Sequence, residues 1–132
     1  MDAQLRQTVR ERAGSRCEYC HLLERVAELP FQIDHIVAEQ HGGPTSEENL
    51  AFACVRCNRY KGPNLSGIDP ESGRITRLFN PRTDNWSEHF FWNDAILAAR
   101  TAIGRATIVV LHVNHPDAEN LRTVLLKEGI AV

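Results

Sequence analysis

The chain has 132 residues, of which 42% are hydrophobic, and its formal net charge at pH 7 is −2. This length predicts one domain with a modest core, small enough for a bound metal ion to matter to its stability. The charge argues against a protein that coats nucleic acid by bulk electrostatic attraction. The first residues form no apolar signal, and no later apolar run approaches the roughly 20 residues that span a bilayer. We therefore expect a soluble, cytoplasmic protein with no membrane partner.

The predicted elements begin with a helix over residues 2–13. Leu5, Val9 and Ala13 are spaced four residues apart, which places them on one face of a helix. Gly14 follows them and is suited to end the helix.

A strand, a loop and a second helix are predicted next. Residues 29–37 (LPFQIDHIV) alternate between apolar and polar positions, which predicts a strand, and His35 falls in the apolar set. Residues 41–50 are rich in turn-forming residues and predict a loop. Residues 54–62 (CVRCNRYKG) predict a short helix that ends at Gly62.

Two hairpins are predicted in the second half of the chain. Residues 66–79 contain Pro and Gly where a turn needs them, which predicts the first hairpin. Residues 88–99 predict a second hairpin that turns at Asn93-Asp94, although a helix over residues 94–100 competes with it.

Two further helices are predicted toward the C-terminus. Residues 101–113 suit a buried helix capped by Thr101, but their β-branched residues also suit a strand. Residues 116–128 predict a last helix, which Gly129 would end.

Charge is unevenly distributed over these elements. Residues 18–49 contain seven acidic residues and one arginine, whereas residues 54–82 contain six basic residues and two acidic ones. The basic segment could contact phosphate groups, or it could form an ordinary solvated surface. Charge alone favours the solvated surface.

The cysteines form two CxxC pairs, Cys17 with Cys20 and Cys54 with Cys57, and 33 residues separate the pairs. A CxxC turn brings two thiolates to one tetrahedral zinc ion, and two such turns complete a site with no open position. In a reducing compartment this spacing indicates a structural zinc site more strongly than disulfides, a redox pair or unrelated core cysteines.

The stretch between the pairs is too long for a loop that only closes a zinc site. It contains Asp34, His35 and Asn49, and Asn58 directly follows the last cysteine. Asn58 lies on the same predicted helix as Cys57, so a metal ion that fixes the cysteines also fixes the direction of Asn58. We expect the zinc to bring the strand and the helix together.

Six ordered segments then resemble one known family. CEYC, IDHI, GG, ENL, CVRCN and the lysine at position 61 are similar to the pattern of HNH endonucleases, the ββα-metal nucleases, in the subgroup with a structural zinc. The resemblance covers roughly residues 15–63, and the following segment resembles the tail of small stand-alone bacterial HNH proteins. It implies an α+β fold with an N-terminal helix (residues 1–14), a treble-clef-like ββα-metal core (residues 15–63) and a C-terminal extension of hairpins and helices (residues 64–132).

The resemblance also implies roles for individual residues. His35 would be the general base, since an imidazole can take a proton from water near neutral pH, and Asn49 would brace the loop and orient His35. Asp34 and Asn58 would hold one divalent cation, Mg²⁺ or Mn²⁺, through oxygen atoms. The founding pattern of the family has histidine at the position of Asn58, which weakens the expectation of a tightly bound transition metal.

Ordinary structural roles compete with these assignments. A histidine in an apolar register is commonly a core residue, and Asn49 could be a helix cap or a turn residue. Adjacent residues on a regular strand also point to opposite faces, so Asp34 and His35 can serve one phosphate only if the backbone is irregular. We expect such irregularity at residues 34–37.

DNA is the partner that the resemblance implies, and no protein partner can be predicted. Arg56, Arg59 and Lys61 lie around the short helix, and His41 precedes two glycines. All four are candidate phosphate contacts. A solvated helix face and a plain turn residue are the alternatives.

Two functions are compatible with the sequence. The first is a metal-dependent nuclease that hydrolyses DNA phosphodiester bonds and leaves 5′-phosphate and 3′-hydroxyl ends, as the family does. The second is a zinc-stapled module that binds nucleic acid or protein without cutting. Only the nuclease requires the residues at positions 34, 35 and 58, and all three are present, so the nuclease is the favoured hypothesis.

Overall fold

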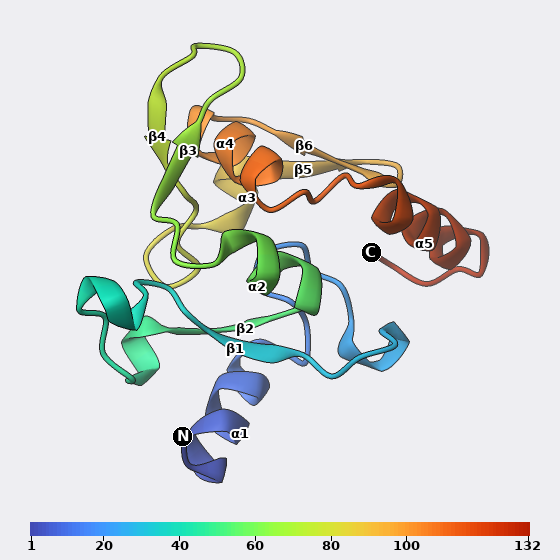
Figure 1. The fold of residues 1–132 in the computed structure, drawn as a ribbon. Coiled ribbons are helices and arrows are strands. Elements are labelled where there is room, and N and C mark those ends of the chain that lie inside the picture. The colour runs from blue at the N-terminus through green and yellow to red at the C-terminus, as the bar shows by residue number, and fades with distance from the viewer.

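The structure is a computed structural model that describes residues 1–132. Figure 1 shows two strands and a short helix, β1, β2 and α2, in the middle of the molecule, with α1 on one side of them and two further hairpins on the other. The fold contains five α-helices and three separate two-stranded antiparallel sheets. This mixture confirms the predicted α+β class. None of the helices combines the length and the apolar character that a membrane span needs.

The predicted N-terminal helix is α1, Ala3–Arg12. The side chain of Asp2 caps it by accepting a hydrogen bond from the backbone N–H of Leu5 at 2.7 Å. Gly14 follows the helix with a φ of 65°, a conformation that favours glycine. Arg12 donates to the carbonyl oxygen of Leu50 at 2.6 Å and so attaches α1 to β2.

The ββα unit consists of β1 (Gln32–His35), β2 (Leu50–Ala53) and α2 (Val55–Lys61). The strands pair with Gln32 opposite Ala53 and His35 opposite Leu50. The observed strand β1 is shorter than predicted because the chain bends at residues 36–37. The connection to β2 contains two short 3₁₀ helices, η2 (Glu39–His41) and η3 (Glu47–Asn49), and another, η1 (Glu24–Val26), precedes β1.

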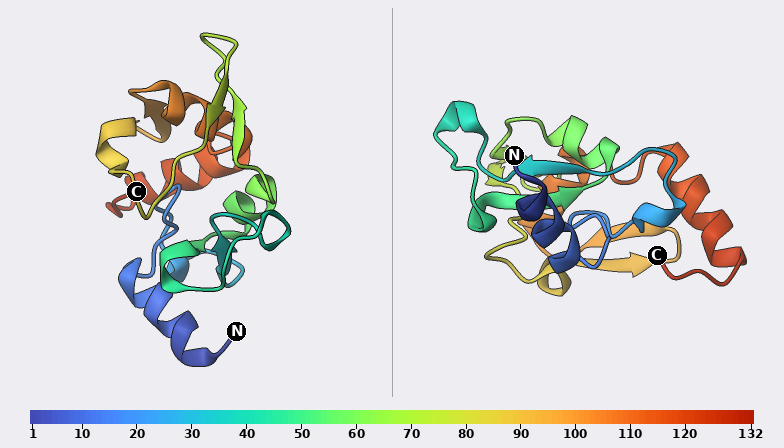
Figure 2. Two further views of the ribbon diagram at one scale, coloured as in Figure 1. Left: turned by 90° about the vertical axis from the view of Figure 1, so that its left-hand side faces the viewer. Right: turned by 90° about the horizontal axis from the view of Figure 1, so that it is seen from below.

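Two hairpins follow, as the turn residues predict. The first is formed by β3 (Ser66–Ile68) and β4 (Ile75–Arg77), and the second by β5 (Phe90–Asn93) and β6 (Ile96–Ala99). The second hairpin turns at Asp94-Ala95, one residue later than predicted, and the alternative helix over residues 94–100 is wrong. Figures 1 and 2 show the first hairpin projecting at the end of the molecule opposite to α1.

The remaining helices are α3 (Trp86–His89), α4 (Ala102–Val110) and α5 (Pro116–Lys127). The ambiguous segment after residue 101 is therefore helical, and the predicted last helix is present. Thr101 caps α4 by accepting from the backbone N–H of Gly104 at 3.1 Å.

One cluster of buried side chains connects the ββα unit to the C-terminal half. It includes Phe31, Leu50 and Phe52 from the first half and Phe79, Phe90 and Leu97 from the second. The indole N–H of Trp86 donates to the carbonyl oxygen of Tyr19 at 2.9 Å. The C-terminal half thus supports the segment that carries the first cysteine pair.

Candidate functional site

The four predicted zinc ligands meet at one point. The Sγ atoms of Cys17, Cys20, Cys54 and Cys57 all lie within 4.8 Å of one another, and all four residues are buried and free of disulfides. The Sγ atoms of Cys20 and Cys54 are 3.7 Å apart. Tetrahedral geometry with Zn–S bonds of about 2.3 Å gives a separation of about 3.8 Å. The cluster therefore fits one zinc ion.

The local backbone supports this interpretation. The N–H of Cys20 points to the sulfur of Cys17 at 3.5 Å, and the N–H of Cys57 points to the sulfur of Cys54 at 3.4 Å. Burial raises the pKa of the Cys17 thiol. Four thiolates at this point therefore require a cation to compensate their charge.

Asp34 lies on the face of β1 that packs against α2. Only 4% of its surface is exposed. Its Oδ2 accepts a hydrogen bond from the hydroxyl of Tyr19 at 2.6 Å, and the Nζ atom of Lys61 lies 3.1 Å from Oδ2 and 3.3 Å from Oδ1. We call this side of the strand, formed by Tyr19, Asp34 and Lys61, the closed face.

The closed face is a buried ion pair with a satisfied hydroxyl. Burial raises the pKa of Asp34, while the Lys61 ammonium and the Tyr19 hydroxyl favour its ionised form. Burial and the Asp34 charge raise the pKa of Tyr19 well above its usual value. Its hydroxyl therefore stays protonated and donates to the carboxylate.

Asn58 does not share a binding site with Asp34 in this arrangement. Its side-chain N–H donates to Oε1 of Gln32 at 2.5 Å. The carboxylate of Asp34 is meanwhile taken by Lys61 and Tyr19. The Lys61 ammonium therefore occupies the position beside the Asp34 carboxylate that a divalent cation shared with Asn58 would need, as the side chains are placed. In the structure Asp34 pairs with Lys61, and the atom of Asn58 that Gln32 engages is Nδ2, not the amide oxygen.

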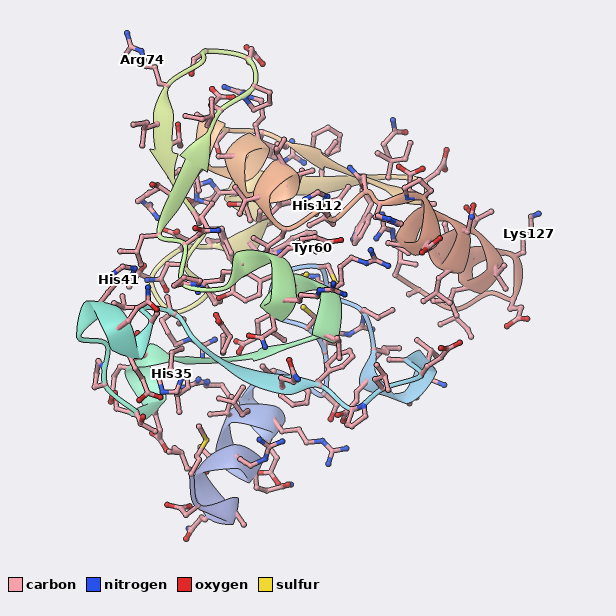
Figure 3. All side chains as sticks on the ribbon, in the orientation of Figure 1. His35, His41, Tyr60, Arg74, His112 and Lys127 are labelled. Atoms are coloured by element: carbon pink, nitrogen blue, oxygen red, sulfur yellow. The ribbon has the colours of Figure 1, made fainter.

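His35 occupies the opposite environment. Its Nε2 atom lies 2.9 Å from the hydroxyl oxygen of Thr45 and 3.4 Å from Oε1 of Glu39, and 18% of the side chain is exposed. Figure 3 places His35 and His41 at the same end of the molecule, beside the connection between β1 and β2. We call this side, formed by His35, Thr45 and the connecting residues 36–49, the open face.

The two faces result from a strand that is regular through both residues. Asp34 pairs with Ala51 and His35 with Leu50, so their side chains alternate as in any strand. The bend comes after them, at residues 36–37. The predicted irregularity over residues 34–37 is therefore correct only for its second half, and it does not bring the two side chains together.

Asn49 braces the connecting loop. Its Oδ1 accepts from the backbone N–H of Val37 at 2.9 Å, and its Nδ2 donates to the carbonyl oxygens of Val37 at 2.9 Å and Pro44 at 2.8 Å. Thr45, which contacts His35, directly follows Pro44. Asn49 therefore fixes the backbone of the loop that carries Thr45.

The loop also depends on Gly43. A Cβ atom added there would lie 1.7 Å from the carbonyl oxygen of Val37 and 2.8 Å from Nδ2 of Asn49. The preceding Gly42 has a φ of 87°, which favours glycine for a different reason. The two glycines allow the loop to close tightly around Asn49.

The four predicted phosphate contacts have different environments. Arg59 and His41 are exposed. Arg56 is half-buried and lines an apolar cavity of about 240 Å³ between the cysteine cluster and α5, which His35 does not line. Lys61 is only 2% exposed. Its prediction as a phosphate contact is therefore corrected, because its ammonium is held inside the protein.

Several contacts of these side chains carry little signal in the sequence. Tyr19 lies inside the segment CEYC, and Glu39 stands four residues after His35, so both positions carry a weak signal of proximity. The position of Thr45 carries no such signal, because threonine is common in loops that are rich in turn-forming residues. Gln32 is equally inconspicuous on an exposed strand position.

Comparison with known proteins gives two findings and one absence. The chain is 26% identical over 109 residues to the Septu protein PtuB of Bacillus thuringiensis, in an alignment that covers 81% of this chain and 40% of PtuB. The chain thus spans about two fifths of the length of this relative. No solved structure matches the chain with significance. The model of the HNH endonuclease family matches residues 17–64, which include both cysteine pairs, β1, β2 and α2. Residues 17–64 are therefore a domain of the HNH endonuclease family.

Proposed function

We propose that the protein is an endonuclease that hydrolyses DNA phosphodiester bonds, with His35 as the general base. The observation that carries the proposal is the placement of His35 at the end of β1. Its ring is fixed by Thr45 and remains partly exposed. A general base needs both a fixed orientation and access to water.

The contacts of His35 support a separate role for each ring nitrogen in this proposal. Glu39 is an acceptor, and the Thr45 hydroxyl can accept, so both favour a proton on Nε2. The lone pair then lies on Nδ1, which takes the proton from water. The oxygen of that water forms a bond to phosphorus, and the bond from phosphorus to the 3′-oxygen breaks. The leaving 3′-oxygen takes a proton from solvent water, which gives 5′-phosphate and 3′-hydroxyl ends. The Glu39 carboxylate stabilises the imidazolium that results.

The metal requirement has two separate parts in this proposal. The cysteine cluster would hold one structural Zn²⁺, which cross-links the segment before β1 to the start of α2. A catalytic Mg²⁺ or Mn²⁺ at Asp34 and Asn58 remains the expectation that follows from the family. The Lys61 ammonium beside the Asp34 carboxylate does not admit it, so no step above depends on it.

DNA contacts are proposed for the exposed residues of the open face and of α2. Arg59 and His41 are available to phosphate groups. The charge of the chain as a whole is −2, so binding depends on such local contacts.

A second candidate is a zinc-stapled module that binds nucleic acid without cutting it. One observation favours it: the Asp34 carboxylate has the Lys61 ammonium as its partner in place of a divalent cation. This module would bind DNA through the same exposed residues but would need neither His35 nor a divalent cation.

Nicking of supercoiled plasmid separates the two candidates. Purified protein is incubated with Mg²⁺, with Mn²⁺ and with EDTA, and compared with the variants His35→Ala and His115→Asn. His115 caps α5, and asparagine preserves a cap there, so this variant removes an imidazole elsewhere. For the nuclease, His35→Ala lowers the rate by about two to four orders of magnitude.

Two outcomes would contradict the nuclease. One is a folded, zinc-containing His35→Ala protein that nicks plasmid at the parental rate. The other is a parental protein that binds DNA but does not cut it with any divalent cation, which would favour the binding module.

A further inference from the structure

The ammonium group of Lys61 is surrounded by oxygen atoms. Besides the two carboxylate oxygens of Asp34, it donates to the carbonyl oxygen of His35 at 3.1 Å and to that of Ile36 at 3.0 Å. The side chain is 3% exposed. Carboxylate and carbonyl oxygens around a small buried charge are also the ligands that a hard divalent cation takes.

Lys61 and a divalent cation cannot use this carboxylate together. The Nζ atom lies 3.1 Å from Oδ2 of Asp34, so a cation bound to the same group would face a positive charge within a few ångströms. In a water-excluded site such like charges repel strongly. Binding of the cation therefore requires Nζ to leave.

The position of Lys61 at the end of a helix favours displacement of its side chain. It is the last residue of α2, and Gly62 follows it outside the helix. Its ammonium stands at the end of a flexible four-carbon chain with rotatable bonds. Displacement requires a change of side-chain rotamer at the end of a helix.

We propose that Lys61 is an internal cation that occupies the divalent-cation position at Asp34, and that the protein binds a divalent cation there only when Lys61 is displaced. The biological role of such a cation site rests on the proposed nuclease function. It is tested on cation binding alone, without DNA, so its failure and that of the nuclease are distinguishable. The alternative is that Lys61 and Asp34 form a purely structural ion pair that covers no cation site.

A second ion pair with a buried carboxylate, Asp69 with Arg105, provides a matched comparison. Asp69 is fully buried and accepts from Arg105 at 2.8 and 3.0 Å. Unlike Asp34, it also accepts from backbone N–H groups, those of Glu71 at 3.1 Å and Ser72 at 3.3 Å. Three donors, counting the Ser72 hydroxyl, therefore remain on Asp69 when Arg105 is removed, whereas Asp34 without Lys61 keeps only the Tyr19 hydroxyl.

The experiment titrates zinc-loaded protein with Mn²⁺ at pH 8 and measures the free ion by electron paramagnetic resonance. Lys61→Met and Lys61→Gln are compared with the parent, with Arg105→Met and with the double variant Asp34→Asn/Lys61→Met. Glutamine can still donate to the two carbonyl oxygens, which supports folding in case methionine does not. Zinc content and circular dichroism verify the fold of each variant.

The expected result is that either Lys61 variant binds one Mn²⁺ at least about tenfold more tightly than the parent, because the competing charge is gone. Arg105→Met gains nothing, and the double variant loses the gain. The melting temperature of the Lys61 variants should also rise with added Mn²⁺.

Three results would overturn the proposal. The first is a folded Lys61 variant with parental Mn²⁺ affinity, and the second is an equal gain in Arg105→Met. The third, which needs no variant, is a parental protein that already binds one Mn²⁺ at micromolar concentration without DNA. A chain that never cuts DNA but gains Mn²⁺ binding on replacement of Lys61 would support the inference and refute the nuclease.

Discussion

The closed and open faces of β1 differ in what their contacts can accomplish. On the closed face, Asp34 is 4% exposed and its carboxylate has partners from the first CxxC pair and from α2. On the open face, His35 is 18% exposed and its contacts come from one loop. Buried charges with complete partners hold segments together, whereas a fixed but accessible imidazole suits chemistry.

The comparison shows that adjacent residues of a motif can have separate functions. Asp34 and His35 are read as one unit in the sequence IDHI, but the regular strand directs them to opposite sides. Substitutions on the closed face should therefore affect stability first. Substitutions on the open face should affect cleavage first.

The largest predicted effect is loss of the proposed zinc ion, which supports the closed face through Tyr19. Cys54→Ser, or treatment with a strong chelator, should remove on the order of 10 kcal/mol of metal-linked folding energy and unfold the ββα unit. Circular dichroism and zinc analysis by mass spectrometry would measure this. Refolding after addition of Zn²⁺ is the control for chelation, and an unchanged melting curve without metal would contradict the prediction.

Replacement of Lys61 is the next largest effect. Lys61→Met leaves the Asp34 charge buried without its partner, which should cost about 3–5 kcal/mol of unfolding free energy. Urea unfolding measures the loss, and Lys127→Met, at an exposed position, is the control. Asp34→Asn/Lys61→Met should lose less than the two single variants together. Full additivity would show that the two residues do not interact.

These two cases also show what the sequence can and cannot predict. The CxxC spacing predicts the cysteine cluster because the geometry of the motif is local. Lys61 was misassigned because a lysine among basic residues on a short helix normally faces solvent. Its burial depends on Asp34, which lies 27 positions earlier, and no periodicity encodes that contact.

The loop between β1 and β2 also has features that the sequence predicts and features that it does not. The pair of glycines and Asn49 predict a tight, braced turn, and their hydrogen bonds and dihedral angles have that form. The contact between Thr45 and His35 depends on how the loop folds back over the strand. The C-terminal hairpin was misplaced by one residue because Asp94, not Asn93, adopts the positive φ.

The third prediction concerns the tightness of the loop on the open face. Gly43→Ala introduces a methyl group against Val37 and Asn49, which should cost about 1–3 kcal/mol and disturb the support of His35. Gly42→Ala is the adjacent control, because its added Cβ has open space and only its positive φ of 87° is strained. Thermal unfolding and plasmid nicking measure both. If Gly42→Ala lowered cleavage more than Gly43→Ala, the proposed close packing around Asn49 would be wrong.

The smallest predicted change in stability is at Thr45. Thr45→Val keeps the shape of the side chain and removes the hydroxyl that lies 2.9 Å from Nε2 of His35. Stability should fall by about 1 kcal/mol, the usual net contribution of one hydrogen bond. Cleavage should fall by about tenfold, because a less well oriented ring meets its water less often. Thr45→Ser should restore the rate because it restores the hydroxyl, and Thr83→Val, at an exposed position, should leave it unchanged. If serine and valine gave equal rates, Thr45 would support the loop only by packing, and the orientation of His35 would come from Glu39 alone.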